Sequence, residues 1–180
     1  MFHFRSPDRI RYDKEYADRV ILDNYEDIYA YCFRHLAHRE TAEDLTQETF
    51  LKFLAGAQGY REYGKLKNYL YVIAGNLIRD YYRKKKEISV EAYMDTMGAA
   101  LPDAEVERAG ERIEIRRALA GLELLDREII ILRYYQELKI KDISAVTGLP
   151  ASTARYRLKK AEKQLRDRLE KGGGEEWTEN

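Results

Sequence analysis

The sequence predicts an all-α protein made of two small helical domains joined by a flexible linker. Apolar residues recur at three- and four-residue spacing along most of the chain, which is the period of an amphipathic helix. The 180 residues contain only three prolines, and alternating β-branched runs are few. Periodicity is lost over 87–109, so we predict a linker there, between domains at 1–86 and 110–171. Residues 172–180, which are rich in glycine and charge, are expected to form a disordered tail.

The composition restricts where the protein works and what it binds. Its 32 basic and 32 acidic residues cancel, so any basic surface must be local. The single cysteine, Cys32, cannot form an internal disulfide, which fits a reducing, cytoplasmic location. No signal peptide is recognisable, and no stretch approaches the roughly 20 apolar residues of a membrane span. We therefore expect no membrane insertion.

Three helical regions and a loop are predicted in the N-terminal domain. Residues 8–37 carry apolar side chains at helical spacing and should form one or two helices. A capping pattern at Thr41 opens a second helix that extends to about Ala55. Residues 58–67 contain two glycines and are predicted to form a loop. The most regular helix follows over 69–86, and its inward positions are Leu70, Ile73, Ala74, Leu77, Ile78 and Tyr81.

The C-terminal domain is predicted to contain a helix-turn-helix. A helical pattern over 110–135 precedes a short helix starting near Lys141, a turn at Gly148 and a basic helix over 150–168. Pro150 suits the first helical turn, and Leu158, Ala161 and Leu165 are spaced to face the core. The DNA-binding positions left on the outer surface are Ser152, Thr153, Arg155, Tyr156, Arg157 and Lys160. Arginine reads guanine through paired hydrogen bonds, whereas lysines contact phosphates.

A second basic element, the helix over 69–86, alternates cations with tyrosines. Such interleaving suits single-stranded nucleic acid, because bases stack on the rings while the cations follow the backbone. The alternative is an amphipathic helix with a solvated end. Some of the tyrosines, Tyr71 or Tyr81, are expected in the core under either interpretation.

The sequence does not support a catalytic site or a metal-binding site. Residues 59–66 nearly match a phosphate-binding P-loop, but Leu66 stands where the motif needs Ser or Thr. Cys32, His35 and His38 are evenly spaced, yet a structural zinc site needs a fourth ligand and there is no second cysteine. No nucleophile–base or paired-carboxylate pattern stands out. We expect no cofactor, no bound metal and no enzymatic activity.

Four motifs together resemble one family. Residues 42–50 (AEDLTQETF) resemble the signature of bacterial RNA polymerase sigma factors of the extracytoplasmic-function (ECF) group. Residues 69–83 (YLYVIAGNLIRDYYR), 127–135 (REIIILRYY) and 148–161 are similar to further motifs of that family, in the same order. The likeness covers roughly 15–86 and 112–168. The sequence departs from the family pattern at Tyr69, Glu123, Pro150, Ser152 and Tyr156.

The resemblance implies partners and residue roles. The partners would be core RNA polymerase, promoter DNA and an anti-sigma factor. Asp44, Gln47 and Glu48 match positions that dock on the polymerase, although Asp44 also suits a helix first turn, where carboxylates are favoured. The minus-ten element would contact Tyr69, Asn76, Arg79, Asp80, Arg83 and Lys84. The minus-thirty-five element would contact the outer face of the 150–168 helix, with Arg155, Arg157 and Lys160 matching family positions.

Two functions therefore compete. A promoter-specificity subunit would direct core polymerase to promoters, bind the minus-thirty-five duplex and capture the melted minus-ten strand. A stand-alone helix-turn-helix regulator would instead form a dimer that binds a palindrome without polymerase.

Overall fold

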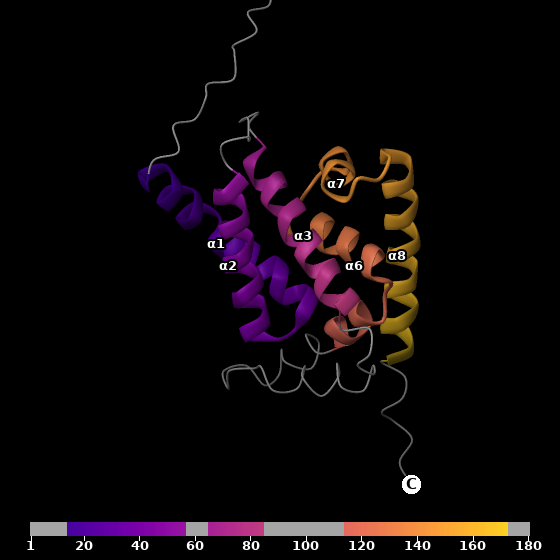
Figure 1. Cartoon of the computed structure of the whole chain (residues 1–180). Coiled ribbons are helices and arrows are strands. Elements are labelled where there is room, and N and C mark those ends of the chain that lie inside the picture. The colour runs from indigo at the N-terminus through magenta and orange to yellow at the C-terminus, as the bar shows by residue number, and fades with distance from the viewer. Residues whose placement is uncertain (1–13, 57–64, 85–113, 173–180) are drawn as a thin grey trace, which may run out of the picture.

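The computed structural model describes residues 14–56, 65–84 and 114–172, and every regular element in these ranges is helical. The all-α prediction is therefore confirmed. The predicted linker at 87–109 and most of the predicted loop at 58–67 lie outside the described residues, as does the tail beyond Gly172. Figure 1 shows the N-terminal helices side by side, with the C-terminal helices packed against α3.

The N-terminal half consists of α1 (Lys14–Leu36), α2 (Arg39–Gly56) and α3 (Leu66–Lys84). The helix α2 begins two residues before Thr41, so the predicted cap is wrong. The ring of His38 performs this role instead: its Nδ1 accepts the Thr41 backbone N–H at 3.3 Å and lies 2.9 Å from Thr41 Oγ1. The chain reverses just before, where Ala37 adopts a left-handed backbone with φ of 51°.

The core of this half includes more residues of α1 than the apolar periodicity predicts. Most of the expected apolar residues pack inward, and Tyr71 rather than Tyr81 is the fully buried tyrosine of α3. The buried face of α1 also includes Tyr31, Cys32 and His35, which were not predicted to be core. Tyr31 packs against both Tyr71 and His35, with ring centroids 5.1 and 4.8 Å apart. This additional face of α1 turns toward the C-terminal half.

The single helix expected over 110–135 is broken. Residues 114–120 are helical, a turn follows at Gly121, and α6 (Leu124–Ile130) starts a new axis. The guanidinium of Arg127 stabilises the break, because Nε donates to Leu119 O at 3.0 Å and Nη2 donates to Ala120 O at 2.7 Å. These carbonyls would otherwise be unsatisfied at a helix end. A π-helical segment, η2 (Ile131–Tyr135), then extends α6.

The predicted helix-turn-helix is formed by α7 (Ile140–Thr147) and α8 (Ala151–Gly172). Gly148 closes α7 with φ of 73°, a conformation that favours glycine. The turn is stabilised by hydrogen bonds from Ser144 Oγ to Leu149 O at 2.5 Å and from Thr147 Oγ1 to Ile143 O at 2.7 Å. Pro150 precedes the first residue of α8, and its carbonyl accepts the first helical hydrogen bond, from Ala154 N. The local motif is confirmed.

The two halves share one continuous core. Buried residues of α1, α2 and α3 form a single cluster with buried residues of α6, α7 and α8. The most extensive contacts between the halves join α3 to α7 and α1 to η2, and side chains of α1 and α3 also reach Glu128 of α6. The C-terminal half therefore packs directly on the N-terminal half in this structure.

Candidate nucleic-acid interface

The outer face of α8 is cationic and carries one exposed aromatic ring. Ser152, Arg155 and Lys160 are exposed, Thr153 is half-buried, and Tyr156 is 69% exposed. Ala154, Leu158 and Ala161 are buried on the opposite side, as the spacing predicts. This amphipathic division leaves a polar helix face that could enter a DNA major groove.

Arg157 differs from this pattern. Its Nη1 lies 2.7 Å from Asp126 Oδ1 and 3.3 Å from Glu123 Oε2, and its side chain is only 25% exposed. The hydrogen bond to Asp126 raises the pKa of Arg157, and desolvation only partly offsets this rise. Arg157 directly precedes Leu158, which is buried, so the Arg157 side chain lies at the border of the buried face of α8 and contacts α6. The expected outward guanidinium is therefore held against the domain, and Lys160 reaches the same carboxylate at 3.4 Å.

The polar face of α3 brings most of the expected minus-ten residues together. Asn76, Arg83 and Lys84 are exposed, and Arg79 and Asp80 are half-buried on the same side. Two short links tie the face together: Arg79 Nη2 donates to Asn76 Oδ1 at 2.7 Å, and Arg83 pairs with Asp80 at 3.0 Å. Tyr69 is half-buried and meets the ring of Phe53 edge-on, so it lies apart from the charged stretch.

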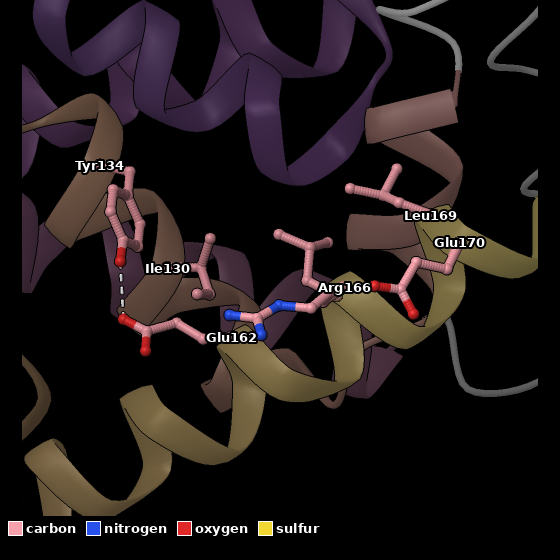
Figure 2. A pocket seen from close by; sticks show the side chains of 7 residues that line it. Ile130, Tyr134, Glu162, Arg166, Leu169 and Glu170 are labelled. Atoms are coloured by element: carbon pink, nitrogen blue, oxygen red, sulfur yellow. Dashed lines mark hydrogen bonds between the residues drawn. The ribbon is translucent and has the colours of Figure 1, made fainter. Parts of the chain in front are cut away.

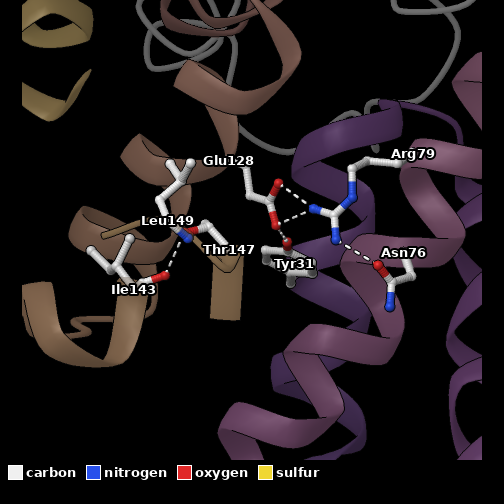
Figure 3. A network of polar contacts seen from close by, with 7 residues as sticks. All are labelled: Tyr31, Asn76, Arg79, Glu128, Ile143, Thr147 and Leu149. Atoms are coloured by element: carbon white, nitrogen blue, oxygen red, sulfur yellow. Dashed lines mark hydrogen bonds and ion pairs between the residues drawn. The ribbon is translucent and has the colours of Figure 1, made fainter. Parts of the chain in front are cut away.

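Arg79 also contacts the other half of the protein. Its Nη1 reaches both oxygens of Glu128, at 2.9 and 2.7 Å, and Glu128 is 2% exposed. Figure 3 shows this carboxylate between Arg79 and Tyr31, whose hydroxyl donates to it at 3.2 Å. Burial raises the pKa of Glu128, and its bonds to Arg79 and Tyr31 oppose that rise. The same burial, with Glu128 beside it, raises the pKa of Tyr31 well above its ordinary value.

One face of α2 gathers the expected polymerase-docking residues. Asp44 and Gln47 are exposed, and half-buried Glu48 pairs with Lys52 at 3.3 Å. Leu51 is 67% exposed and follows Asp44 and Gln47 at helical spacing, so it lies on the same face. The sequence reasoning missed Leu51. It could have been found from the sequence, because Leu51 is an apolar residue at a helix position whose side chain the periodicity places on the outer surface.

An open groove lies on the C-terminal half, between α6 and the last turns of α8. Figure 2 shows its lining, with Ile130 and Leu169 on its walls and the Tyr134 hydroxyl donating to Glu162 Oε1 at 2.6 Å. The groove has a volume of about 530 Å³. Because its walls are mainly apolar, it suits an apolar side chain better than a charged substrate.

The cysteine and the histidine of α1, Cys32 and His35, are both buried in the core. Burial raises the pKa of the Cys32 thiol to about 12, and burial beside Arg127 and Arg79 lowers the pKa of His35 to about 3. No cluster of three or more potential metal ligands occurs among the described residues. Within the same ranges, no helix has the length and apolarity that crossing a membrane would require.

Three buried polar residues that the sequence reasoning missed connect the halves. Arg127, Glu128 and His35 are 7%, 2% and 1% exposed. Arg127 and Glu128 belong to the motif at 127–135, and nothing in the local pattern of that motif indicates that these two charged residues are buried. Their burial follows from contacts with residues more than 40 positions away in the sequence, which no local pattern reveals.

Family comparisons match both halves. The Sigma-70 region 2 model matches residues 20–88, and the Sigma-70, region 4 model matches residues 112–165. Among curated relatives, RNA polymerase sigma factor YlaC of Bacillus subtilis is 30% identical over 157 residues, covering 84% of this chain and 91% of the relative. The ECF RNA polymerase sigma factor SigM of Bacillus subtilis is 30% identical over 164 residues, covering 88% of this chain and 98% of the relative.

Solved structures support the same fold. The sigma factor RpoE from Bartonella quintana, solved with the anti-sigma factor NepR, superposes with a TM-score of 0.69 at 23% identity, covering 88% of this chain and 98% of that one. CnrH, solved with the cytosolic domain of CnrY, gives a TM-score of 0.65 at 20% identity, covering 92% and 98%. With the two region matches and the extended identity to YlaC and SigM, the chain belongs to the ECF group of RNA polymerase sigma factors.

Proposed function

We propose that this sigma factor uses three separate faces to start transcription at specific promoters. The exposed face of α8 binds the minus-thirty-five duplex, the charged face of α3 engages the minus-ten strand, and the face of α2 around Asp44 docks on core RNA polymerase. The observation that carries this proposal is the exposure of these faces on three different helices, each amphipathic and each packed on the core by its opposite side. The protein thus acts as an initiation factor in the cytoplasm.

On α8 the proposed DNA contacts are shared unequally. Arg155 and Tyr156 carry the base and sugar contacts, because their side chains are exposed. Ser152 and Thr153, in the first turn, suit phosphate or base edges beside the helix N-terminus. Arg157 and Lys160 share Asp126, so Arg157 serves chiefly to fix α8 on α6, while exposed Lys160 can still reach a phosphate.

On α2 the proposed docking face combines charge with one apolar side chain. Asp44 and Glu48 give it an acidic rim, and Gln47 adds an amide. Leu51 supplies an exposed apolar centre of the kind that anchors protein interfaces. This mixture fits a protein partner better than DNA, which would repel the carboxylates.

Strand capture provides the driving force for melting in this proposal. Separating DNA costs about 1.4 kcal/mol for each base-pair step on average. The face of α3 offers cations at Arg79, Arg83 and Lys84 and tyrosines nearby, so binding of the exposed strand can offset that cost.

Run-off transcription with core polymerase and a promoter selected from a genomic library tests the proposal. Arg155→Ala should weaken duplex binding by the holoenzyme, and Asp44→Ala together with Leu51→Ala should weaken binding to core polymerase without changing the thermal stability. Glu15→Gln, at an exposed position near the start of α1, serves as the control. Absence of promoter-dependent transcription from every library member would refute it.

The stand-alone regulator is not favoured, because relatives across most of the chain are sigma factors. A stable dimer that shifts palindromic DNA without polymerase would revive it. We also propose that an anti-sigma factor controls this chain, since RpoE was solved with the anti-sigma factor NepR and CnrH was solved with the cytosolic domain of CnrY. Co-purification of the tagged chain from its host tests this partner.

A further inference from the structure

The groove between α6 and the last turns of α8 exposes apolar surface outside the three faces of the proposed function. Ile130 is buried and lies at its base, while Leu165 and Leus at the end of α8 are represented by partly buried Leu169. The Tyr134 ring, which is 57% exposed, forms one side. Covering such a surface removes apolar area from water, which favours binding of an apolar group.

The walls of the groove are held in place by the protein itself. At one end the Tyr134 hydroxyl donates to Glu162 Oε1 at 2.6 Å, which fixes the ring against α8. Figure 2 shows this pair at one end of the groove, Leu169 and Glu170 at the other end, and Arg166 between them. The groove is therefore formed before anything binds to it.

The size of the groove suits one large side chain. Seven residues line it, and its volume is about 530 Å³. A stable interface between two proteins involves roughly 20–30 residues on each side, so this groove alone is too small to hold a second copy of the chain. An aromatic ring, which buries a large apolar area through a single side chain, is the better match.

The continuation of the chain provides such a ring close to the groove. The helix α8 ends at Gly172, three positions beyond Leu169. The sequence then continues with Gly173, Gly174, two glutamates and Trp177, which is the only tryptophan in the 180 residues. Consecutive glycines permit the left-handed backbone conformations that reverse a chain after a helix.

The distance from the end of α8 to the groove is within reach of this tryptophan. Arg166, near the middle of the groove, precedes Gly172 by six residues, which corresponds to about 9 Å along a helix axis. Trp177 follows Gly172 by five residues, and an extended chain of that length spans up to about 17 Å. The segment is therefore long enough to turn back and place its ring on the groove.

The charges of the two partners are complementary. Arg166 is exposed and has no ion-pair partner among the residues that the structure describes. The carboxylates that line the groove, Glu162 and Glu170, lie toward its two ends in Figure 2, so its middle is cationic. The two glutamates directly before the tryptophan can pair with this guanidinium, which also suits the face of an indole ring.

We propose that Trp177 folds back onto the groove and packs its indole ring against Ile130 and Leu169 when the protein is free. Tethering keeps the ring at a high effective concentration, so it competes well with any apolar segment that is not part of the chain. A protein partner that inserts an apolar side chain there has to displace Trp177. This inference departs from the disordered tail that composition predicts for residues 172–180.

Fluorescence of the native chain tests the proposal directly, because Trp177 is the only tryptophan. Excited where tyrosine does not absorb, the full chain should emit at shorter wavelength than a peptide of residues 172–180. Its quenching by acrylamide should be at least threefold weaker than that of the peptide. A full chain quenched as strongly as the peptide would overturn the inference, whichever other segment or partner covers the groove.

Substitutions in the groove show whether it is the site that protects Trp177. Leu169→Ala removes part of a wall and Arg166→Glu reverses the central charge, and each should raise acrylamide quenching at least twofold. Asp167→Ala and Lys163→Glu are the matched controls, because both positions are exposed on α8 and do not line the groove. Thermal melting confirms that each variant is folded. Equal protection in all four variants would place the ring elsewhere and refute the proposal.

Removal of the ring should uncover the groove. Trp177→Ala should bind several-fold more anilinonaphthalene sulfonate, a dye that reports exposed apolar surface, than the native chain. Thr178→Ala, one residue further along, is the control and should bind no more dye than the native chain. Equal dye binding by the two variants would show that Trp177 does not cover the groove in the free protein.

Discussion

The Arg157 guanidinium and the Asp126 carboxylate form an ion pair of 2.7 Å that fastens α8 to α6. Asp126 is fully buried, and its second oxygen receives Lys160 at 3.4 Å. A residue expected to read DNA is thus also a support for the helix that carries it. The orientation of α8, and with it the position of Arg155, depends on this pair.

Arg157→Ala should therefore lower stability as well as DNA binding. Loss of the guanidinium leaves Asp126 buried with only the longer contact to Lys160, and we expect about 2 kcal/mol less free energy of unfolding, less than for a fully enclosed pair because Arg157 is partly exposed. Urea denaturation measures the change. Arg155→Ala, at an exposed position two residues away, should alter stability by less than about 0.5 kcal/mol. Equal stability of the two variants would contradict a supporting role for Arg157.

Arg127 should be the most sensitive cation of the C-terminal half. Its guanidinium donates to carbonyls at the end of the 114–120 helix and to His35 O in the N-terminal half. Arg127→Ala leaves these groups buried without their donor, and we expect a loss of at least about 3 kcal/mol in the free energy of unfolding. Arg127→Lys should recover only a small part, since an ammonium cannot reproduce the planar fork. In thermal melting, exposed Arg133→Ala is the control, and a wild-type melting temperature for Arg127→Ala would refute the assignment.

Because of His35, the protein should become less stable as the pH falls below about 6.5, the ordinary pKa of a histidine side chain. Its pKa is about 3 in the folded protein and near 6.5 when unfolded, so between these values the unfolded state binds the extra proton. Stability from this group is complete above pH 6.5 and declines by about 1.4 kcal/mol for each pH unit below it, which is roughly 2 kcal/mol from pH 7 to pH 5. The raised pKa of Glu128 acts in the opposite direction at the acidic end. Urea denaturation at both pH values should show a smaller loss for His35→Phe than for the native chain; an identical loss would exclude His35 as the cause.

Gly148→Ala should weaken the helix-turn-helix through the backbone alone. The φ of 73° is unfavourable for any residue with a Cβ, although no heavy atom lies within 4 Å of a Cβ built there. We expect about 1–2 kcal/mol of destabilisation, with a smaller cost for Gly148→Asn, which tolerates this conformation better. Calorimetric melting of the two variants provides the comparison. A greater loss for Asn than for Ala would show that space, not backbone strain, governs the position.

Local patterns were sufficient for much of this fold. Apolar spacing predicted the three N-terminal helices, and the Gly148 turn with its basic helix predicted the helix-turn-helix. Boundaries were less accurate: the Thr41 pattern satisfies capping rules, yet the His38 ring lies one turn earlier and caps first. The apolar spacing over 110–135 continues across the turn at Gly121, so it did not reveal that two separate helices occupy this range. Apolar residues can keep a helical spacing in the sequence even where the chain changes direction between two helices.

The candidate site was predictable where exposure decides the role and unpredictable where tertiary pairing does. Arg155 and Arg157 look alike in sequence, but only the second lies beside buried Leu158 and within reach of Asp126. Arg79 shows the same limit, since its partner Glu128 is 49 residues away. Charges that pair across the fold leave no periodic trace, so their burial emerges only from the packed structure.

The close approach of the Glu128 carboxylate to Gly75 of α3, where a Cβ atom would lie 2.8 Å from Glu128 Oε1, has a consequence for how this protein and its relatives can diverge. An acid at position 128 is tolerated beside α3 only while position 75 has no side chain, so substitutions at the two sites are not independent. Relatives in which α6 packs on α3 in this way should keep glycine and the acid together, whereas relatives with a larger residue at position 75 should have replaced the acid at position 128. Covariation between positions 75 and 128 would then record this close contact.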